Sequence, residues 1–345
     1  MKTSSVVSSV LSFLTLILPH LVYAQIAPSY RIVPLGNFAP SGGSYSYRMS
    51  DSGDLMTGIS RLNSQSPYTP FIYTRSGGYS NPGSPAGAPY SWGQSINDSG
   101  RTLVIVASRS YIYTRVNSSY QEIMNPFGGT SVGVLDINNN NLVVGSARDS
   151  LNQLRAFLWN NGVVTDLTAL YGITNAININ NDGDIACSIT TTYTQGCVII
   201  DGILHMINTS GSQGGIPLGM NNLGTVVGSS GDITGLARGF KYDGVSQLLP
   251  IINNFNPAHP KDISDCGQIV GTGFTMPPNA LFSRAFIMSN SVIVDLNTRI
   301  PANSGWILQD AVDIAKTNGR ILINGTLNGE FRSAILIPIG GGTCQ

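Results

Sequence analysis

The chain is poor in charge. Its 345 residues include 18 Lys and Arg against 18 Asp and Glu, and charged residues make up 10% of the sequence. An ordinary soluble domain has about 25%. A binding face for nucleic acid or for an anionic membrane needs clustered Lys and Arg, so the composition argues against a nucleic-acid-binding protein. Hydrophobic residues, at 42%, are sufficient for a packed core and exclude wholesale disorder.

Long apolar runs are absent beyond the N-terminus. There, one Lys precedes an apolar run over 6–18, and a small-residue motif ends at Ala24, as in a secretory signal peptide. We predict a signal peptide over 1–24, cleavage between Ala24 and Gln25, and an exported protein, extracellular or periplasmic. The alternative is an uncleaved anchor, but the apolar core 11–18 is about half of the roughly 20 residues that a span requires. No stable membrane span is expected after cleavage.

Long runs of Ala, Glu, Lys and Leu are also absent, while the sequence has 40 Gly and 18 Pro, which favours short strands joined by turns. One pattern recurs: apolar-Asn-x-x-Gly, an apolar run, a polar gap, then small-aromatic-apolar-aromatic. Its clearest copy spans 137–167. Seven copies, 41 to 52 residues apart, predict one all-β domain over 25–345, a seven-bladed propeller of four-stranded antiparallel blades. The copies begin near Met49, Ile96, Ile137, Ile179, Met220, Ile263 and Ala315.

Each part of the pattern indicates a turn or a strand. The Asn, Asp and Gly residues, as at 97–100, tolerate left-handed backbone and predict the turn between the first and second strands. The apolar run that ends in Gly, as at 143–145, predicts the second strand, and a segment such as 164–167 predicts the fourth. A ring that recurs at one place on the third strand predicts packing between blades. That position is filled by Phe71, Tyr111, Phe157, Cys197, Phe240, Phe286 and Ala334.

The ends of the chain predict closure of the ring. The seventh copy has three strand-like segments and then runs into the glycines at 340–342, with no fourth strand. The first copy is preceded by a spare strand-like segment at 30–36. We expect residues 30–36 to complete the last blade, which removes exposed sheet edges that invite aggregation.

The four cysteines allow three pairings in an exported protein. In the fourth copy, Cys187 replaces the Gly of the second strand and Cys197 replaces the aromatic residue of the third. A small residue facing a large one is thus exchanged for two of medium size, which predicts that the two positions face each other. We expect a Cys187–Cys197 disulfide, leaving Cys266 to pair with Cys344. The alternative is four free thiols in a reducing compartment.

The units resemble the HAF repeats of bacterial extracellular proteins, which read roughly Ile-Asn-x-x-Gly-x-Val-Val-Gly, then Ala-Phe-Leu-Trp, then Gly and Thr-Asp-Leu. The match is close at 137–167, good at 220–249 and 263–296, and weak in the first, second and last units. Arg155 and Arg284 stand where the family has its namesake His. The resemblance implies secretion and a repeat β fold, and it supplies no catalytic residue or ligand.

Motifs for catalysis and for metal binding are absent. The segment 178–184 resembles a calcium loop, but Ile189 stands where an EF-hand needs a bidentate Glu. No nucleophile elbow, phosphate loop, His-Glu-x-x-His or Cys-x-x-Cys pattern occurs, and no pair of carboxylates can be nominated for glycoside hydrolysis. The sequence therefore predicts no catalytic residue, no metal and no cofactor.

Three aromatic residues are candidates for ligand binding. In a propeller, the connections between second and third strands and those between blades open on one face, where ligands usually bind. The long predicted connections 77–92 and 299–309 carry Tyr90, Trp92 and Trp306, of types enriched in recognition sites. The alternative is that these rings pack beneath their own loops.

These features favour an exported, non-catalytic binding protein that recognises a protein or a glycan through its loop-rich face. Two alternatives stay open at this point. One is a secreted polysaccharide hydrolase or lyase with its site at the propeller axis, and the other is an outer-membrane β-barrel. The sequence leaves the oligomeric state open.

Overall fold

The fold is taken from a computed structural model, which describes most of the chain. The predicted signal peptide, with its cleavage site between Ala24 and Gln25, lies outside the described residues. So does Cys344, the predicted partner of Cys266. The described residues are 28–36, 44–61, 63, 65–85, 88, 90–209, 214–231, 236–252, 255–275 and 283–340.

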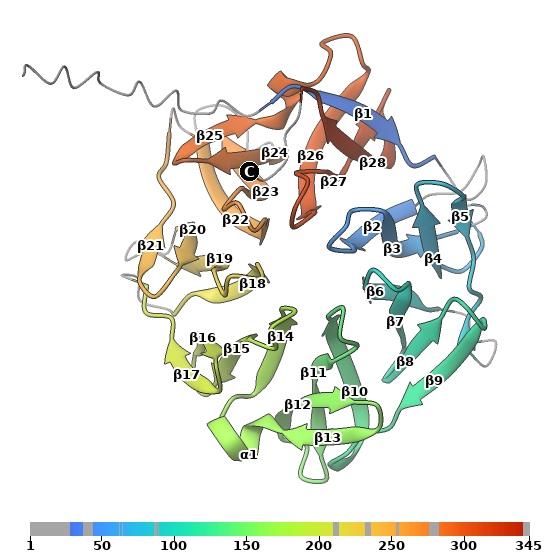
Figure 1. Cartoon of the computed structure of the whole chain (residues 1–345), viewed down its shortest axis with the longest axis vertical. Coiled ribbons are helices and arrows are strands. Elements are labelled where there is room, and N and C mark those ends of the chain that lie inside the picture. The colour runs from blue at the N-terminus through green and yellow to red at the C-terminus, as the bar shows by residue number, and fades with distance from the viewer. Residues whose placement is uncertain are drawn as a thin grey trace, which may run out of the picture.

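Seven separate four-stranded antiparallel sheets surround a central axis (Figure 1). This confirms the predicted seven-bladed β-propeller. The outer-membrane alternative is wrong, because each set of four strands forms a sheet of its own. Blades 1 to 3 comprise β2 (Ser44–Met49), β3 (Leu55–Ser60), β4 (Thr69–Thr74), β5 (Gly78–Ser80); β6 (Trp92–Ile96), β7 (Arg101–Val106), β8 (Arg109–Thr114), β9 (Ser119–Ile123); β10 (Gly128–Ile137), β11 (Val143–Asp149), β12 (Leu154–Asn160) and β13 (Val163–Asp166). Blades 4 to 6 comprise β14 (Asn175–Ile179), β15 (Ile185–Thr190), β16 (Thr194–Ile200), β17 (Ile203–Met206); β18 (Ile216–Met220), β19 (Val226–Gly231), β20 (Ala237–Tyr242), β21 (Ser246–Leu248); β22 (Phe255–Ile263), β23 (Ile269–Thr275), β24 (Ser283–Ser289) and β25 (Val292–Asp295). Blade 7 comprises β26 (Trp306–Ile314), β27 (Ile321–Leu327), β28 (Glu330–Pro338) and β1 (Tyr30–Pro34).

Blade 7 is completed by the N-terminal strand, as predicted. β1 pairs antiparallel with β28, in a register that runs from Tyr30 opposite Pro338 to Pro34 opposite Ala334. Figure 1 shows β1, at the blue end of the chain, lying along the red strands of the last blade. The outer edge of blade 7 is therefore covered by a strand 300 residues away in sequence.

The hydrophobic core lies between the blades. Among the described residues, buried apolar side chains form seven clusters, and each cluster joins two neighbouring blades. Phe157 of blade 3, for example, packs in one cluster with Leu103 and Ile112 of blade 2. The third-strand position thus faces the preceding blade, which confirms the packing role predicted for it. Burying one such ring contributes about 1.5–3 kcal/mol.

The same position explains a repeated glycine. Gly228 of β19 lies opposite Phe240 of β20, and a Cβ at Gly228 would lie 2.0 Å from the Ile216 carbonyl oxygen and 2.8 Å from the Phe240 ring. In blade 4 the two facing positions are Cys187 and Cys197. They form a disulfide with Cα atoms 4.9 Å apart, so the first predicted bridge is confirmed.

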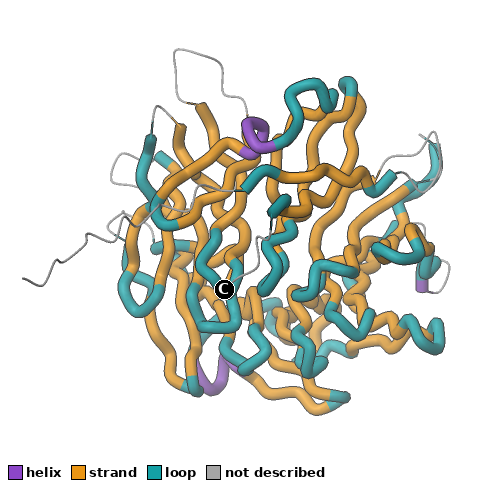
Figure 2. The backbone as a smooth tube through the Cα atoms, turned by 45° about the horizontal axis from the view of Figure 1, so that its top comes forward, coloured by secondary structure: helices purple, strands orange, loops and turns teal. Residues whose placement is uncertain are grey.

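Helical turns occur where the chain leaves two blades. α1 (Leu167–Tyr171) and the 3₁₀ turn η2 (Leu296–Arg299) begin after Asp166 and Asp295, whose side chains accept hydrogen bonds from backbone N–H groups of the turn. Figure 2 shows how small the helical part is beside the strands. No helix in the described part of the chain has the length and apolar content needed to cross a membrane.

Candidate functional site

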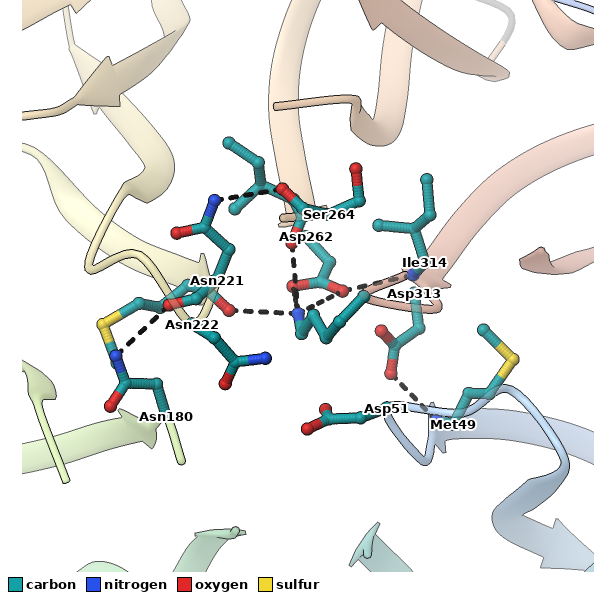
Figure 3. A network of polar contacts seen from close by, with 12 residues as sticks. Met49, Asp51, Asn180, Asn221, Asn222, Asp262, Ser264, Asp313 and Ile314 are labelled. Atoms are coloured by element: carbon teal, nitrogen blue, oxygen red, sulfur yellow. Dashed lines mark hydrogen bonds and ion pairs between the residues drawn. The ribbon is translucent and has the colours of Figure 1, made fainter. Parts of the chain in front are cut away.

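The first strand of every blade lies beside the axis, against the first strands of its two neighbours. In all seven blades this strand shifts register near its end, as at a β-bulge, which re-aims a side chain. In three blades the residue before the strand's end is an aspartate whose Oδ2 accepts from a backbone N–H of the following blade. The three hydrogen bonds are Ile179 N–H to Asp136 (3.1 Å), Ile314 N–H to Asp262 (3.1 Å) and Met49 N–H to Asp313 (2.8 Å, Figure 3).

The turns between first and second strands are joined around the ring. In four successive blades an Asn amide donates to a turn carbonyl of the following blade. Backbone contacts of Lys316 with Asp265 and Asp51 join blades 6, 7 and 1, and Ser52 N, which donates to Asp98 Oδ1 at 2.9 Å, joins blade 1 to blade 2. This hydrogen bonding explains why the sequence repeats Asn at these turns. The four amide contacts are Asn97 to Asn138 O (2.9 Å), Asn138 to Asn180 O (2.8 Å), Asn180 to Asn221 O (3.4 Å) and Asn221 to Ser264 O (3.0 Å).

Side chains also cross the axis at this level. Asp51 of blade 1 accepts from Asn139 Nδ2 of blade 3 (3.1 Å) and from Asn181 Nδ2 of blade 4 (2.7 Å). Lys316 Nζ of blade 7 donates to the Met220 carbonyl of blade 5 (3.0 Å). We call the seven turns and these crossing side chains the closed end. Above it lies an inner cavity of about 50 Å³, lined by residues from all seven blades.

The inner cavity is rich in charge. Its lining includes Arg48, Lys316 and the carboxylates of four aspartates, among them Asp262 and Asp313. Burial alone would raise the pKa of Asp262, but Lys316, 2.7 Å from Oδ1, holds it below its ordinary value. Burial and the neighbouring Asp262 charge raise the pKa of Asp313 well above its ordinary value. Asp313 therefore keeps a proton where Asp262 has lost one.

Arg48 separates the inner cavity from a larger one. Arg48 lines both cavities. Burial alone would lower the pKa of its guanidinium, but the charges of Asp313, Asp136 and Asp262 outweigh that effect and raise the pKa. With the Asn178 amide oriented to satisfy both of its atoms, its oxygen accepts from Arg48 Nη2 at 2.8 Å. Arg48 is thus held by Asn178, a residue of the inner cavity, and it also borders the larger cavity.

The larger cavity, of about 420 Å³, is formed by the earlier residues of the first strands in blades 1, 2, 5, 6 and 7. We call it the mouth. It combines aromatic rings with charged groups at the axis, on the face opposite the closed end. Its lining includes Tyr45, Tyr47, Arg48, Trp92, Lys261 and Asp310.

Asp310 organises one side of the mouth. Its carboxylate accepts from Thr272 Oγ1 (2.6 Å), Lys261 Nζ (2.7 Å) and Tyr45 Oη (3.2 Å). Burial and the Asp310 charge raise the pKa of Tyr45 to about 12, so Tyr45 is a hydrogen-bond donor at neutral pH. The rings of Tyr45 and Tyr47 lie 5.6 Å apart and are tilted by 58°, which makes an aromatic corner.

The three aromatic residues named from the sequence have different surroundings. Trp92 begins β6 and lines the mouth, where its Nε1 donates to Gln94 Oε1 at 3.2 Å. Tyr90 is 63% exposed and is not part of the mouth lining. Trp306 is 8% exposed and packs in the cluster between blades 6 and 7. The structure thus brings one of the three to the mouth.

Sequence reasoning missed Tyr45, Tyr47, Lys261 and Asp310. One sequence feature points to these positions: the residues just before the repeated turn differ from copy to copy, while the turn itself repeats. In the part of the chain that the structure describes, no group of three or more His, Cys, Asp or Glu side chains is placed to hold a metal ion.

Comparison with known proteins places the chain by fold. No protein-family model matches it, and no curated protein matches it in sequence. The β-propeller domain of the Trilobed protease from Pyrococcus furiosus superposes with a TM-score of 0.58 at 11% identity, over 90% of this chain and 97% of that one. The extracellular domain of a putative one-component system from B. thetaiotaomicron gives 0.52 at 13% identity, over 89% of this chain and 39% of that one.

A third similar structure is the Pyrococcus horikoshii acylaminoacyl peptidase, with a TM-score of 0.50 at 11% identity, over 87% of this chain and 53% of that one. Similarity at this level shows the β-propeller fold. Fold alone does not carry function from one protein to another, so the role of this chain has to be argued from its own residues.

Proposed function

We propose that this chain is an exported, non-catalytic propeller that binds a glycan at its mouth. The observation that supports this most is the composition of the mouth, where Tyr45, Tyr47 and Trp92 line one cavity with Arg48, Lys261 and Asp310. Aromatic rings offer apolar faces to sugar rings, and a few placed polar groups fix orientation. The volume of about 420 Å³ lies in the usual range for ligand sites, roughly 300–1,000 Å³.

The surroundings of the carboxylates favour binding over hydrolysis. Glycoside hydrolysis generally uses two carboxylates that flank the scissile bond, and among the described residues that line the mouth, Asp310 is the one carboxylate. Its oxygens already accept three hydrogen bonds. The aspartates of the inner cavity lie behind Arg48 and hold neighbouring blades together.

Two further observations fit export. The Cys187–Cys197 disulfide belongs in an oxidising compartment, and the N-terminal sequence has the form of a signal peptide. We also propose that the repeats belong with the HAF repeats of bacterial extracellular proteins, on the basis of the motif in residues 137–167.

The test is binding of the mature protein to a printed glycan array, followed by calorimetry on the glycans that bind. Tyr47→Ala should weaken binding about tenfold through loss of one stacking surface. Tyr193→Ala is the matched control, since Tyr193 is 55% exposed in the β15–β16 connection and is not among the residues that line the mouth.

Three results would contradict the proposal. The first is absence of binding to any printed glycan, and the second is equal weakening by Tyr47→Ala and Tyr193→Ala. The third is release of reducing ends or of unsaturated products from a bound glycan, which would favour the hydrolase or lyase alternative.

A further inference from the structure

A second cavity adjoins the mouth. It has a volume of about 340 Å³ and extends over blade 7. Tyr45 and Asp310 line both cavities, so their hydrogen bond of 3.2 Å stands at the boundary. Lys261, which lines the mouth, and Thr272, which lines the second cavity, both donate to the Asp310 carboxylate. The boundary is therefore a braced partition, and a ligand in the mouth has a neighbouring compartment beside it.

The lining of the second cavity differs from that of the mouth. Apart from the shared Tyr45 and Asp310, it consists of hydroxyl, amide and glycine groups, such as those of Ser283, Gln309 and Asn324, together with the ring of Phe331. No Lys or Arg is among the described residues that line it. Asn324 forms the floor, since it is 3% exposed and its amide bonds to Ser46 O at 2.9 Å. Neutral polar groups beside one ring suit an uncharged sugar unit.

Phe331 is held where a stacking ring would be useful. It is 64% exposed and follows the two-residue turn of Asn328 and Gly329, whose φ angles are 51° and 86°. Such a turn, with positive φ at both residues, matches the twist of the strands it joins and makes a tight hairpin. Phe331 pairs across that hairpin with Thr326. The ring is thus exposed on a rigid element at the rim of a polar cavity.

We propose that the glycan extends from the mouth across the Tyr45–Asp310 partition into this second cavity, where a further, uncharged sugar unit stacks on Phe331. This inference rests on the proposed function. It names the ligand class as an oligosaccharide chain, bound at two subsites, rather than a single terminal sugar. The site then prefers longer chains, because the second subsite is filled only by a unit beyond the first.

Chain-length dependence tests the proposal. The probe is an array of mono-, di-, tri-, tetra- and hexasaccharides built on glucose, galactose, mannose, xylose and N-acetylglucosamine backbones. For the wild type, affinity should rise with length. Phe331→Ala should lower binding of tetra- and hexasaccharides about tenfold and leave monosaccharides unchanged. Phe331→Tyr keeps the ring and should retain the length dependence, and Tyr193→Ala, in the corresponding hairpin of blade 4, should behave like the wild type.

The outcomes separate the two proposals. If Tyr47→Ala weakens all lengths while Phe331→Ala binds every length like the wild type, the second subsite is refuted and the mouth stands. If Phe331→Ala weakens all lengths equally, the length-specific role of Phe331 is refuted. If no array glycan binds, or if Tyr47→Ala has no effect, the proposed function fails and the second subsite fails with it. Equal melting temperatures of the variants exclude a folding defect.

Discussion

The two ends of the propeller axis are built in opposite ways, one from the turns of all seven blades and the other from the first strands of five blades. At the closed end residues repeat, and in four successive blades an Asn side chain at the equivalent position joins its turn to the turn of the next blade. At the mouth the residues differ from blade to blade, and rings, a Lys, an Arg and an Asp meet in one cavity. Repetition closes one end, and departure from repetition creates a site at the other.

The difference follows from what each end must do. A turn that bonds to an identical turn on the next blade can repeat seven times, since each copy is both donor and acceptor. A ligand is not seven-fold symmetric, so a site for it requires unlike residues around the axis. On the proposed function, the closed end stabilises the ring and the mouth recognises the ligand, and substitutions can separate the two.

The largest expected effect comes from replacing a lysine at each end. The Lys316 side chain is 12% exposed and holds Asp262 at 2.7 Å, while that of Lys261 is 33% exposed and pairs with Asp310. Lys316→Met leaves a buried carboxylate without its counter-ion, which costs about 3–5 kcal/mol. Lys261→Met breaks a pair whose side chains are 33% and 12% exposed, but Asp310 keeps Thr272 and Tyr45 as hydrogen-bond donors, so the cost should be smaller, about 1–2 kcal/mol.

Urea unfolding of both variants at pH 7 measures the two costs. Lys241→Met is the control, because its ion pair with Asp243 lies on the surface. Equal losses for Lys316→Met and Lys261→Met would remove the distinction between a stabilising end and a binding end.

A smaller effect is expected from Asp313→Asn, as a change in pH dependence. Because the pKa of Asp313 is raised in the fold, the folded state keeps a proton that the unfolded chain releases near pH 4. Above that pH the folded state binds more protons, so this group lowers the free energy of unfolding by about 1.4 kcal/mol per pH unit. Asparagine retains an oxygen for the Met49 N–H and carries no charge. The stability of the variant relative to the wild type should therefore rise as the pH increases above 4.5, until the pH reaches the pKa of Asp313 in the folded state.

Urea unfolding at pH 4.5, 5.5 and 6.5 gives that difference. Asp262 does not obscure it, because its pKa is lowered and its contribution is complete above the unfolded value near 4 and is lost only at more acid pH. Asp243→Asn, at the surface, serves as the control. A difference that is constant or that falls with pH would contradict the retention of a proton by Asp313 in the inner cavity.

The fold could be predicted because its determinants are local and repeated. The turn at 97–100 and the Gly228–Phe240 pair recur in several copies, so each copy corroborates the others. The fourth copy departs from the pattern in an informative way. Cys187 and Cys197 replace the small and the large residue that face each other in other copies, which predicted the disulfide between them. The ring closure followed from a missing fourth strand at one end and a spare strand at the other.

The site could be predicted only in part, because it is assembled across the ring. Tyr45 and Asp310 are 265 residues apart, and no local pattern relates them. Only closure of the ring brings blades 6, 7 and 1 together. For Trp306, the sequence suggested a place in the site that the residue does not occupy. Its position suggested a loop, but β26 begins at Trp306, which pairs with Leu327 and turns its ring into the core.

The smallest expected effect tests whether the mouth is electrostatically independent of the closed end. His259 lies on β22, with its Nδ1 2.9 Å from Ser229 Oγ and its ring edge-on to Phe274. Burial and the charge of Lys261 lower the pKa of His259, and Asp310 opposes them. Lys261→Met removes the repulsion and should raise the pKa of His259 toward 6.5 by a fraction of a unit. NMR titration of the imidazole C–H signals measures the shift, with the exposed His205 as an internal reference. Lys316→Met should leave His259 unchanged. An equal shift in that variant would mean that the charges of the closed end act on the mouth through the axis.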